Sequence, residues 1–381
     1  MNFNKRTSVK FGLAVLVLAV LSWQFDLLLY LGTLVVEHTR LMAARRPIQT
    51  LIASGDTPSE LREKLEYVLR ARNFASAALG EPNNGSYTKY VELHRSNISW
   101  NVFAAPQLST TPINWCFPFA GCVVYRGYFS RSKADSFATG LHAKGNDVYV
   151  SGVTAYSTLG WFDDPVLSTF INRSPTDLAG IIFHELAHQE LYVPGDSAFN
   201  EGFAVTVQEE GVRRWLTAEK QPSVLEQAEE SRRETDRAVG ILLRAKDHLS
   251  HVFSSSLSPE LQRQQKDLIL RTTQDVLCGL GKTCEDSVLP RAAPGELKEL
   301  NNAYLVAVAT YYYYVPAFRE LLKRSGFDLP KFYEAVRAVG KMPIARRHQF
   351  LDSLVPSIVA SGDGLGLEAN NSGHSLCESR R

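Results

Sequence analysis

The sequence predicts an α+β fold in which a small mixed sheet is followed by a well-marked helix and a mostly helical C-terminal half. Three observations support this fold class. Residues 86–162 hold short β-branched and aromatic runs that are separated by turn residues. Between Ser174 and Val193 the apolar residues have helical spacing, with helix start and stop signals at the two ends. We call this segment the marked helix. Residues 217–285 and 295–355 have helical character.

The order of these segments predicts four parts. Residues 1–36 are expected to be a signal-anchor or signal peptide, and residues 37–216 an αβ half that carries the marked helix. Residues 217–359 are expected to form a helical half. Residues 360–381 are expected to be a disordered tail, because Gly, Ser and Asn dominate there without apolar periodicity. With 381 residues the chain can bury a sizeable core, as one large domain or two modest ones.

The N-terminus has the features of an export signal. Three basic residues among the first ten precede the almost wholly apolar run Phe11–Trp23. The apolar character resumes after Asp26, so residues 12–31 are long enough to cross a bilayer. We expect an uncleaved signal-anchor with the rest of the chain outside the cytoplasm, because the positive charges precede the apolar run. A cleaved signal peptide is the next alternative, and a buried core helix is the remaining one.

The elements that precede the marked helix follow in order. Residues 37–80 are expected to be helical, with a break at Arg45-Arg46-Pro47-Ile48 and a cap-like start at Thr57 for a helix over residues 61–74. A loop over residues 82–85 leads into the sheet region, which also holds one helix over residues 132–144. The residues that indicate strands are Tyr87, Tyr90, Val91, Ile98, Trp100, Val102, Phe103, Val123, Val124, Tyr125, Val148, Tyr149 and Val150.

The marked helix and its successor have clear boundaries. Ser174 is placed to cap the N-terminus, Pro175 fits the first helical position, and Asp177 fits the capping box. The run Pro194-Gly195-Asp196-Ser197 ends the first helix, and Asp196 or Ser197 can cap a second helix from about residue 198. The short connection predicts that the second helix returns over the first.

This helix pair carries a candidate metal site. His184 and His188 lie one turn apart on the same helical face, so both imidazoles can bind one Zn²⁺ ion. Glu185 beside them can deprotonate a metal-activated water. A catalytic zinc usually takes three protein ligands, and Glu201, thirteen residues after His188, is our candidate for the third. The alternative is a buried amphipathic helix whose two histidines are satisfied by hydrogen bonds.

The five cysteines are consistent with an oxidising compartment. Cys116 and Cys122, and likewise Cys278 and Cys284, each enclose five residues, while Cys377 stands alone. This spacing is too wide for the two-residue knuckles of structural zinc sites, so we expect two local disulfides. Reduced, buried thiols are the alternative.

His184-Glu185-x-x-His188 with the downstream pair Asn200-Glu201 resembles the zincin metallopeptidases, in particular the branch with a glutamate as third ligand. More closely, the chain is similar to the bacterial family of predicted zinc aminopeptidases over about residues 40–355. The further blocks that carry this resemblance are Arg45-Arg46-Pro47-Ile48, Trp115-Cys116-Phe117-Pro118, Ala120-Gly121-Cys122, Tyr125-Arg126-Gly127-Tyr128-Phe129 and Ala155-Tyr156-Ser157-Thr158-Leu159-Gly160-Trp161-Phe162.

The resemblance implies a zincin-like fold and a zinc-dependent peptidase. It implies Zn²⁺ as cofactor with His184, His188 and Glu201 as ligands, Glu185 as general base, and a peptide as substrate. Together with the N-terminal segment it implies the bacterial cell envelope: the protein is anchored in the inner membrane facing the periplasm, or secreted to the periplasm. A lipid-modified cysteine is excluded as the anchor, because no cysteine precedes Cys116.

Three further roles stay open at this point. By resemblance, Ala155–Gly160 could be the strand that binds peptide substrate by strand addition, although an internal strand without a ligand fits equally well. Asp163 or Asp164 could bind a substrate amine. Tyr304 or one member of the run Tyr311–Tyr314 could polarise the scissile carbonyl, although an aromatic cluster more often belongs to the core.

Charge and motifs exclude some classes of function and leave others open. The formal net charge is +1 and no long basic block occurs, so a nucleic-acid partner is not expected. Specificity for free N-termini depends on the family resemblance alone, because the G-x-M-E-N signature of other zinc aminopeptidases is absent. An endopeptidase or an amidase is therefore an alternative. A membrane-tethered binding or chaperone-like protein that keeps a metal site without turnover is a second one.

Overall fold

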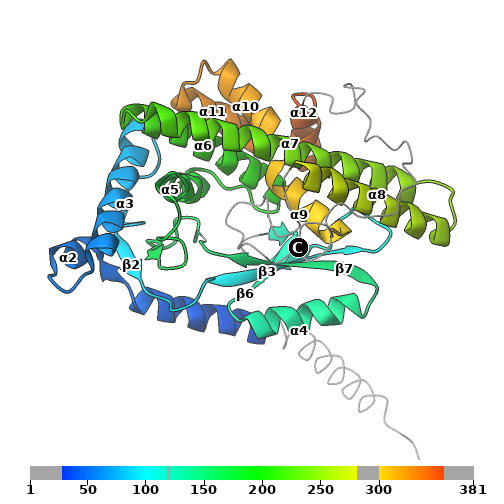
Figure 1. The fold of residues 1–381 in the computed structure, drawn as a ribbon, viewed down its shortest axis with the longest axis horizontal. Helices are drawn as coiled ribbons and strands as arrows, with labels where there is room; N and C mark the ends of the chain where they lie inside the picture. The colour runs from blue at the N-terminus through cyan, green and yellow to red at the C-terminus, as the bar shows by residue number, and fades with distance from the viewer. Residues whose placement is uncertain (1–27, 118–120, 156, 281–299, 356–381) are drawn as a thin grey trace, which may run out of the picture. The chain divides into compact units, whose positions relative to one another are not determined.

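The computed structural model describes residues 28–117, 121–155, 157–280 and 300–355 (Figure 1). The chain divides into two compact units, Met1–Arg45 and Arg46–Arg381. In the first unit, the described residues 28–43 form a helix. No helix among the described residues is both long and apolar enough to span a membrane. The apolar run Phe11–Trp23 and the tail over residues 360–381 lie outside the described residues, so both stay predictions.

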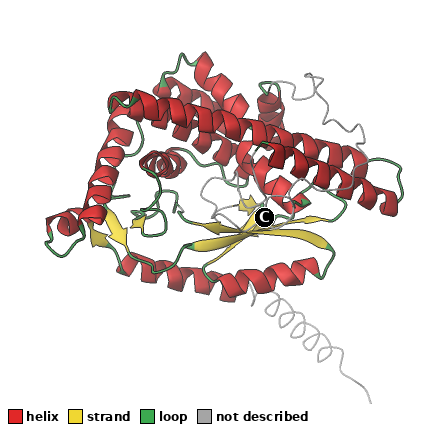
Figure 2. Ribbon diagram, viewed as in Figure 1, coloured by secondary structure: helices red, strands yellow, loops and turns green. Residues whose placement is uncertain are grey.

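The second unit is an α+β structure, as predicted, and helices make up most of it (Figure 2). The described helices are α2 (Ile48–Ala53), α3 (Ser59–Ala78), α4 (Arg131–His142), α5 (Pro175–Glu190), α6 (Ser197–Ala218), α7 (Pro222–Phe253), α8 (Pro259–Gly279), α9 (Asn302–Tyr312), α10 (Val315–Arg324), α11 (Leu329–Gly340) and α12 (Ile344–Asp352). The described strands are β1 (Arg46–Pro47), β2 (Lys89–Val91), β3 (Ser99–Pro106), β4 (Trp115–Phe117), β5 (Gly121–Val123), β6 (Tyr125–Tyr128), β7 (Asn146–Val153) and β8 (Val166–Leu167).

The strands form three small sheets where the sequence predicted one mixed sheet. Strand β2 pairs antiparallel with β1 and parallel with β8, so this sheet is mixed. Strands β6, β3 and β7 form an antiparallel sheet in that order, and β4 and β5 form a hairpin. Arg46 and Pro47, which the sequence marked only as a break between helices, pair with Tyr90 and Lys89.

One predicted strand is wrong. None of the described residues of Ala155–Gly160 belongs to a strand: β7 ends at Val153, and the chain then turns. The backbone takes positive φ angles at Leu159 (58°) and Gly160 (81°), which an extended strand does not accommodate. A substrate strand over this segment is therefore not proposed again.

The β6-β3-β7 sheet lies between two helices. Helices α4 and α9 both pack on β3 and β7, and Figure 1 shows them on opposite sides of the sheet. The core on the α9 side joins Phe103 of β3 and Tyr149 of β7 to Val205 of α6 and Leu242 of α7. This core links the sheet to the helices that carry and support the candidate site.

The C-terminal half is helical, as predicted. Helix α9 ends at Tyr312 and α10 begins at Val315. Pro316 explains the break, because it lacks an amide hydrogen and favours the first turn of a new helix. The predicted boundary after residue 216 falls inside the second compact unit, and the division into two halves stays a prediction.

Candidate metal centre

Helix α5 begins as the sequence predicted. Ser174 Oγ accepts a hydrogen bond from the backbone N–H of Asp177 at 3.2 Å and donates one to its carboxylate at 2.7 Å, and Pro175 occupies the first turn. Every residue from Leu178 to His188 is buried. The helix is therefore fixed in the protein interior along the whole length that carries the candidate ligands.

Helices α5 and α6 approach each other closely because glycines lie in their contact. A Cβ atom at Gly211 would lie 2.7 Å from the ring of Phe183, and one at Gly180 would lie 3.2 Å from the Gln208 amide. No real side chain tolerates the first of these distances without movement. Close approach in turn brings the side chains at the start of α6 within reach of the histidine face of α5.

A short, tied-down turn reverses the chain between the two helices. Asp196 caps α6 by accepting a hydrogen bond from the N–H of Phe199 at 3.1 Å. The Asn200 amide bonds both the N–H and the C=O of Val193, each at 2.8 Å. The hydrogen bonds of Asn200 thus fix the turn and do not reach a group near the candidate metal site. The fixed turn places Glu201 as the fifth residue of α6.

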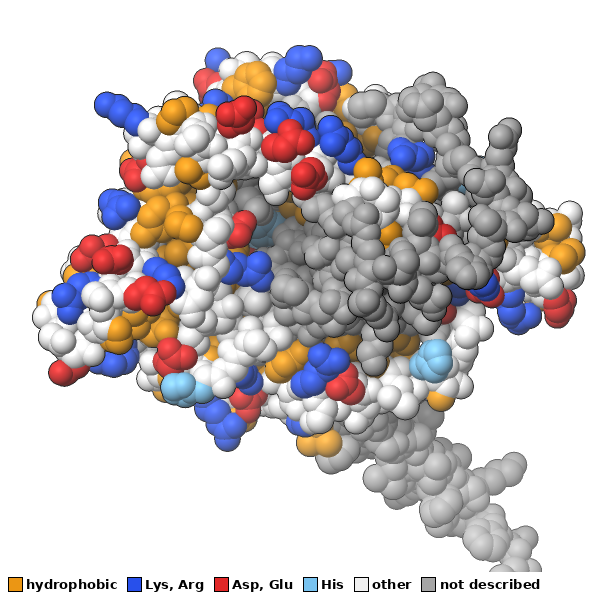
Figure 3. Space-filling view, in the orientation of Figure 1, with side chains coloured by type: hydrophobic (Ala, Val, Ile, Leu, Met, Phe, Trp, Pro, Cys, Tyr) orange, Lys and Arg blue, Asp and Glu red, His pale blue; other side chains and the backbone are white. Residues whose placement is uncertain are grey.

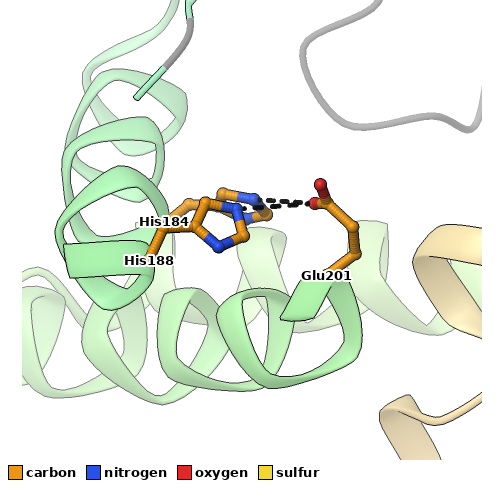
Figure 4. A group of neighbouring side chains, drawn as sticks. All are labelled: His184, His188 and Glu201. Carbon is orange, nitrogen blue, oxygen red and sulfur yellow. Dashed lines mark hydrogen bonds and ion pairs between the residues drawn. The ribbon is translucent and has the colours of Figure 1, made fainter. Parts of the chain in front are cut away.

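The three candidate ligands converge, as Figure 4 shows. Glu201 Oε2 lies 3.3 Å from His184 Nε2 and 3.7 Å from His188 Nε2. One ligand atom from each residue lies within 4.8 Å of the other two. Among the described residues no other group of His, Cys, Asp or Glu meets this criterion. A metal ion can therefore bind between α5 and α6.

The local chemistry fits a cation. All three side chains are buried, and a buried carboxylate beside two imidazoles is stabilised by a positive charge between them. His184 Nδ1 lies 3.0 Å from Oε1 of Gln208. With the Gln208 amide in this orientation, its oxygen only accepts, so Nδ1 carries the proton and Nε2 turns its lone pair toward the other ligands.

Glu185, the predicted general base, is fully buried on α5. Asp164 is also buried and close enough for the Glu185 charge to act on it. Burial raises the pKa of Asp164 to about 6 and Glu185 adds to the shift, although hydrogen bonds from Thr158 and Ser157 oppose it. Asp164 Oδ2 accepts hydrogen bonds from the N–H of Thr158 at 2.9 Å and from Gln189 at 3.2 Å. Its neighbour Asp163 is partly exposed.

The sequence reading missed two residues that support the site. Gln208 follows Glu201 by seven residues, which places both on one face of α6, and this spacing was a usable signal. Tyr192 lies in the turn between the helices, where burial and the charge of Glu201 raise its pKa.

The tyrosines proposed for carbonyl polarisation belong to the core. Tyr304, Tyr311 and Tyr312 are buried in the cluster that contains Phe103 and Tyr149. Tyr304 packs edge to face on Tyr149 with ring centroids 5.1 Å apart. These rings stabilise the packing of α9 on the sheet.

A cavity of about 980 Å³ lies beside the metal centre but is separate from it. It is lined by α6, α7 and α10 and includes Gln208 and Glu209, whereas none of the three candidate ligands lines it. Within it Arg319 is held by Glu209 at 2.6 Å and by Asp236 at 2.9 Å.

In the space-filling view, one face of the molecule is hollowed, and a histidine and an acidic side chain are visible in the hollow (Figure 3).

Fold and site together define an α+β protein with a buried His-His-Glu group on a hairpin of two helices. A scan against family models matches the family described as Putative aminopeptidase over residues 29–351, and the chain belongs to this family. The predicted family is thereby confirmed, and its description indicates a peptidase. Neither the curated proteins nor the solved structures contain a match to the chain.

Proposed function

We propose that the protein is a zinc-dependent peptidase of zincin-like fold, and that it acts as an aminopeptidase. The observation that carries this proposal is the convergence of His184, His188 and Glu201 from two helices, with Glu185 buried beside them. The family to which the chain belongs supports a peptide substrate and the preference for free N-termini.

Zinc is the proposed ion because two imidazoles and one carboxylate are a frequent ligand set of catalytic zinc. The bound ion would supply Lewis acidity, lowering the pKa of a water and polarising the scissile carbonyl. Two neutral imidazoles and one carboxylate leave the site with a charge of about +1, which favours the negative charge that develops on the carbonyl oxygen. Gln208 orients His184 for this purpose.

Glu185 is the proposed general base. Its carboxylate takes the proton of the attacking water and delivers it to the nitrogen of the leaving amine. The fully buried position of Glu185 excludes bulk water, which strengthens its interaction with charges that form nearby. A scaffold without turnover has no use for such a base, and this argues against the binding-protein alternative.

We also propose that the protein works outside the cytoplasm, anchored by or released from its N-terminal segment. The disulfide between Cys116 and Cys122 supports this, because such bonds persist in oxidising compartments. Cys278 is also disulfide-bonded, but its predicted partner Cys284 lies outside the described residues.

The test combines elemental analysis of the purified protein with a panel of peptides that have free or blocked N-termini. We expect one zinc per chain and cleavage of the free peptides, with activity lost on chelation and restored by zinc. Cleavage of blocked peptides only would refute the aminopeptidase assignment. One zinc per chain without hydrolysis of any peptide would favour a binding protein.

A further inference from the structure

Two large aromatic side chains are exposed on a short loop near the metal centre. We call residues 157–162 the aromatic loop. Its last two residues, Trp161 and Phe162, are 70% and 52% exposed. Exposing large apolar rings to water costs free energy, so adjacent aromatic residues on a solvent-exposed surface commonly indicate a binding site.

The aromatic loop is held in one conformation by its own hydrogen bonds. Thr158 accepts from the N–H of Trp161 through its carbonyl at 3.1 Å and from the N–H of Phe162 through its hydroxyl at 3.2 Å. Ser157 Oγ accepts from the N–H of Leu159 at 3.1 Å, and Asp164 accepts from the N–H of Thr158. The exposure of the two rings is therefore a property of a fixed loop.

The aromatic loop lies against the metal-binding helix. A Cβ atom at Gly160 would be 3.7 Å from Cβ of Gln189, and Gln189 donates to Asp164 at 3.2 Å. On a helix, Gln189 lies one turn after Glu185, on the flank next to the face that carries His184 and His188. Trp161 and Phe162 directly follow Gly160, so the aromatic loop meets α5 one turn after Glu185.

We propose that Trp161 and Phe162 bind a large apolar side chain of the peptide substrate, next to the scissile bond, and so determine specificity. This inference rests on the proposed peptidase function. An apolar side chain that packs on the exposed surface of the two rings removes apolar area from water, whereas a charged one loses hydration without gaining a partner. A fixed loop adds to the preference, because no ordering cost is incurred on binding.

The test compares the wild type with Trp161→Ala, Phe162→Ala and the double variant. The substrates are free peptides in which the residue on either side of the scissile bond is Leu, Phe, Ala, Asp or Lys. We expect about a tenfold lower kcat/KM for each single variant on the Leu and Phe substrates, mainly through KM, and little change on the Ala substrate. Zinc content should remain one per chain.

Leu268→Ala is the matched control, because Leu268 is also 52% exposed but lies on α8. It should leave both rate and selectivity unchanged. An equal loss on all substrates, or unchanged selectivity in the double variant, would overturn the inference.

If the wild type cleaves no peptide, the proposed function fails by itself. Calorimetry of the same peptides then decides on the loop: tighter binding of Leu and Phe peptides, lost in the double variant, supports it, and equal binding overturns it.

Discussion

Gln208 of α6 accepts a hydrogen bond from Nδ1 of His184 on α5, across the contact between the two helices, at 3.0 Å. This bond fixes the tautomer and the ring orientation of a proposed metal ligand, and it comes from the helix that also carries Glu201. The two helices are therefore linked at two places. One is the group of His184, His188 and Glu201, which would share the metal ion. The other is the hydrogen bond of Gln208 to the opposite nitrogen of the His184 ring.

Replacing Gln208 should weaken the metal site without removing a ligand. Gln208→Ala leaves Nδ1 of His184 without its acceptor, so the imidazole can rotate or change tautomer. We expect the zinc affinity to fall about 10- to 100-fold, measured by competition with a chromophoric chelator. Gln227→Ala, which lines the neighbouring cavity, is the control and should bind zinc as the wild type does. Equal affinities in both variants would contradict the role of Gln208.

Glu185→Gln should separate metal binding from turnover. The amide has nearly the same shape as the carboxylate but cannot take a proton from water, so we expect kcat to fall by about 10²- to 10⁴-fold. Zinc content should stay at one per chain. His184→Ala, by comparison, should lose both zinc and activity. The general-base assignment is wrong if purified Glu185→Gln cleaves peptides at the wild-type rate.

The pH dependence of stability should reveal a contact between α12 and α6. His348 Nε2 lies 2.9 Å from Oδ2 of Asp196, and the carboxylate raises the pKa of His348 above its usual 6.5. Because the folded pKa is the higher one, this stabilisation is complete below about pH 6.5 and is lost as pH rises through the folded pKa. Arg347 binds the same carboxylate and opposes the shift, so the effect should be small.

The measurement is the midpoint of thermal unfolding between pH 5.5 and 8.5, with chelator present. The wild type should lose more stability across this range than His348→Gln, in which no charge forms at the position. Parallel curves for the two proteins would show that the His348–Asp196 pair does not contribute.

The helix hairpin could be predicted from sequence because its signals are local. Ser174, Asp196, both histidines and Glu201 act within a turn or two of their own positions, and all of them lie where the spacing placed them.

Strand pairing is not local. Tyr149 pairs with Phe103, far away in the chain, and the alternation of apolar residues does not identify the partner. The same applies to the segment after β7. Its composition suits a strand, but the positive φ angle at Leu159 and the bonds to Asp164 produce a loop instead.

The close approach of α5 and α6 should be sensitive to a single methyl group. In Gly211→Ala the new Cβ would lie 2.7 Å from the Phe183 ring and 2.9 Å from Leu79, so one of the helices has to move. Overpacking of this kind costs about 1–3 kcal/mol of unfolding free energy, more than the gain of about 1 kcal/mol in helix propensity. Zinc affinity should fall as well, since the shift separates the histidines from Glu201.

Gly240→Ala provides the comparison in denaturant unfolding. Its new Cβ would lie 3.5 Å from the flexible end of Arg244 on α7, so helix propensity should dominate and stability should rise slightly. If Gly211→Ala were as stable as Gly240→Ala, the close packing of α5 on α6 would be wrong.

Glu201 and Glu210 provide a direct test of the third ligand, because both are buried glutamates on α6 with 6% exposure. They differ in their partners: Glu201 faces the two histidines, whereas Glu210 is bound by Arg213 at 2.8 Å and Arg214 at 2.6 Å. Glu201→Gln should therefore lose zinc and activity, because a neutral amide is a poor ligand and leaves the site without its negative charge.

Glu210→Gln should keep one zinc per chain and most of the activity. The Glu210→Gln substitution should lower the unfolding free energy, because the two arginines lose their buried, charged partner. Burial alone would raise the pKa of Glu210, but the two arginines hold this pKa below its usual value, so the charged pair stabilises the folded state. Elemental analysis and denaturant unfolding of the two variants measure both effects. Full zinc occupancy in Glu201→Gln would mean that the third ligand is another group, and the hydrolytic mechanism would have to be rebuilt around that group.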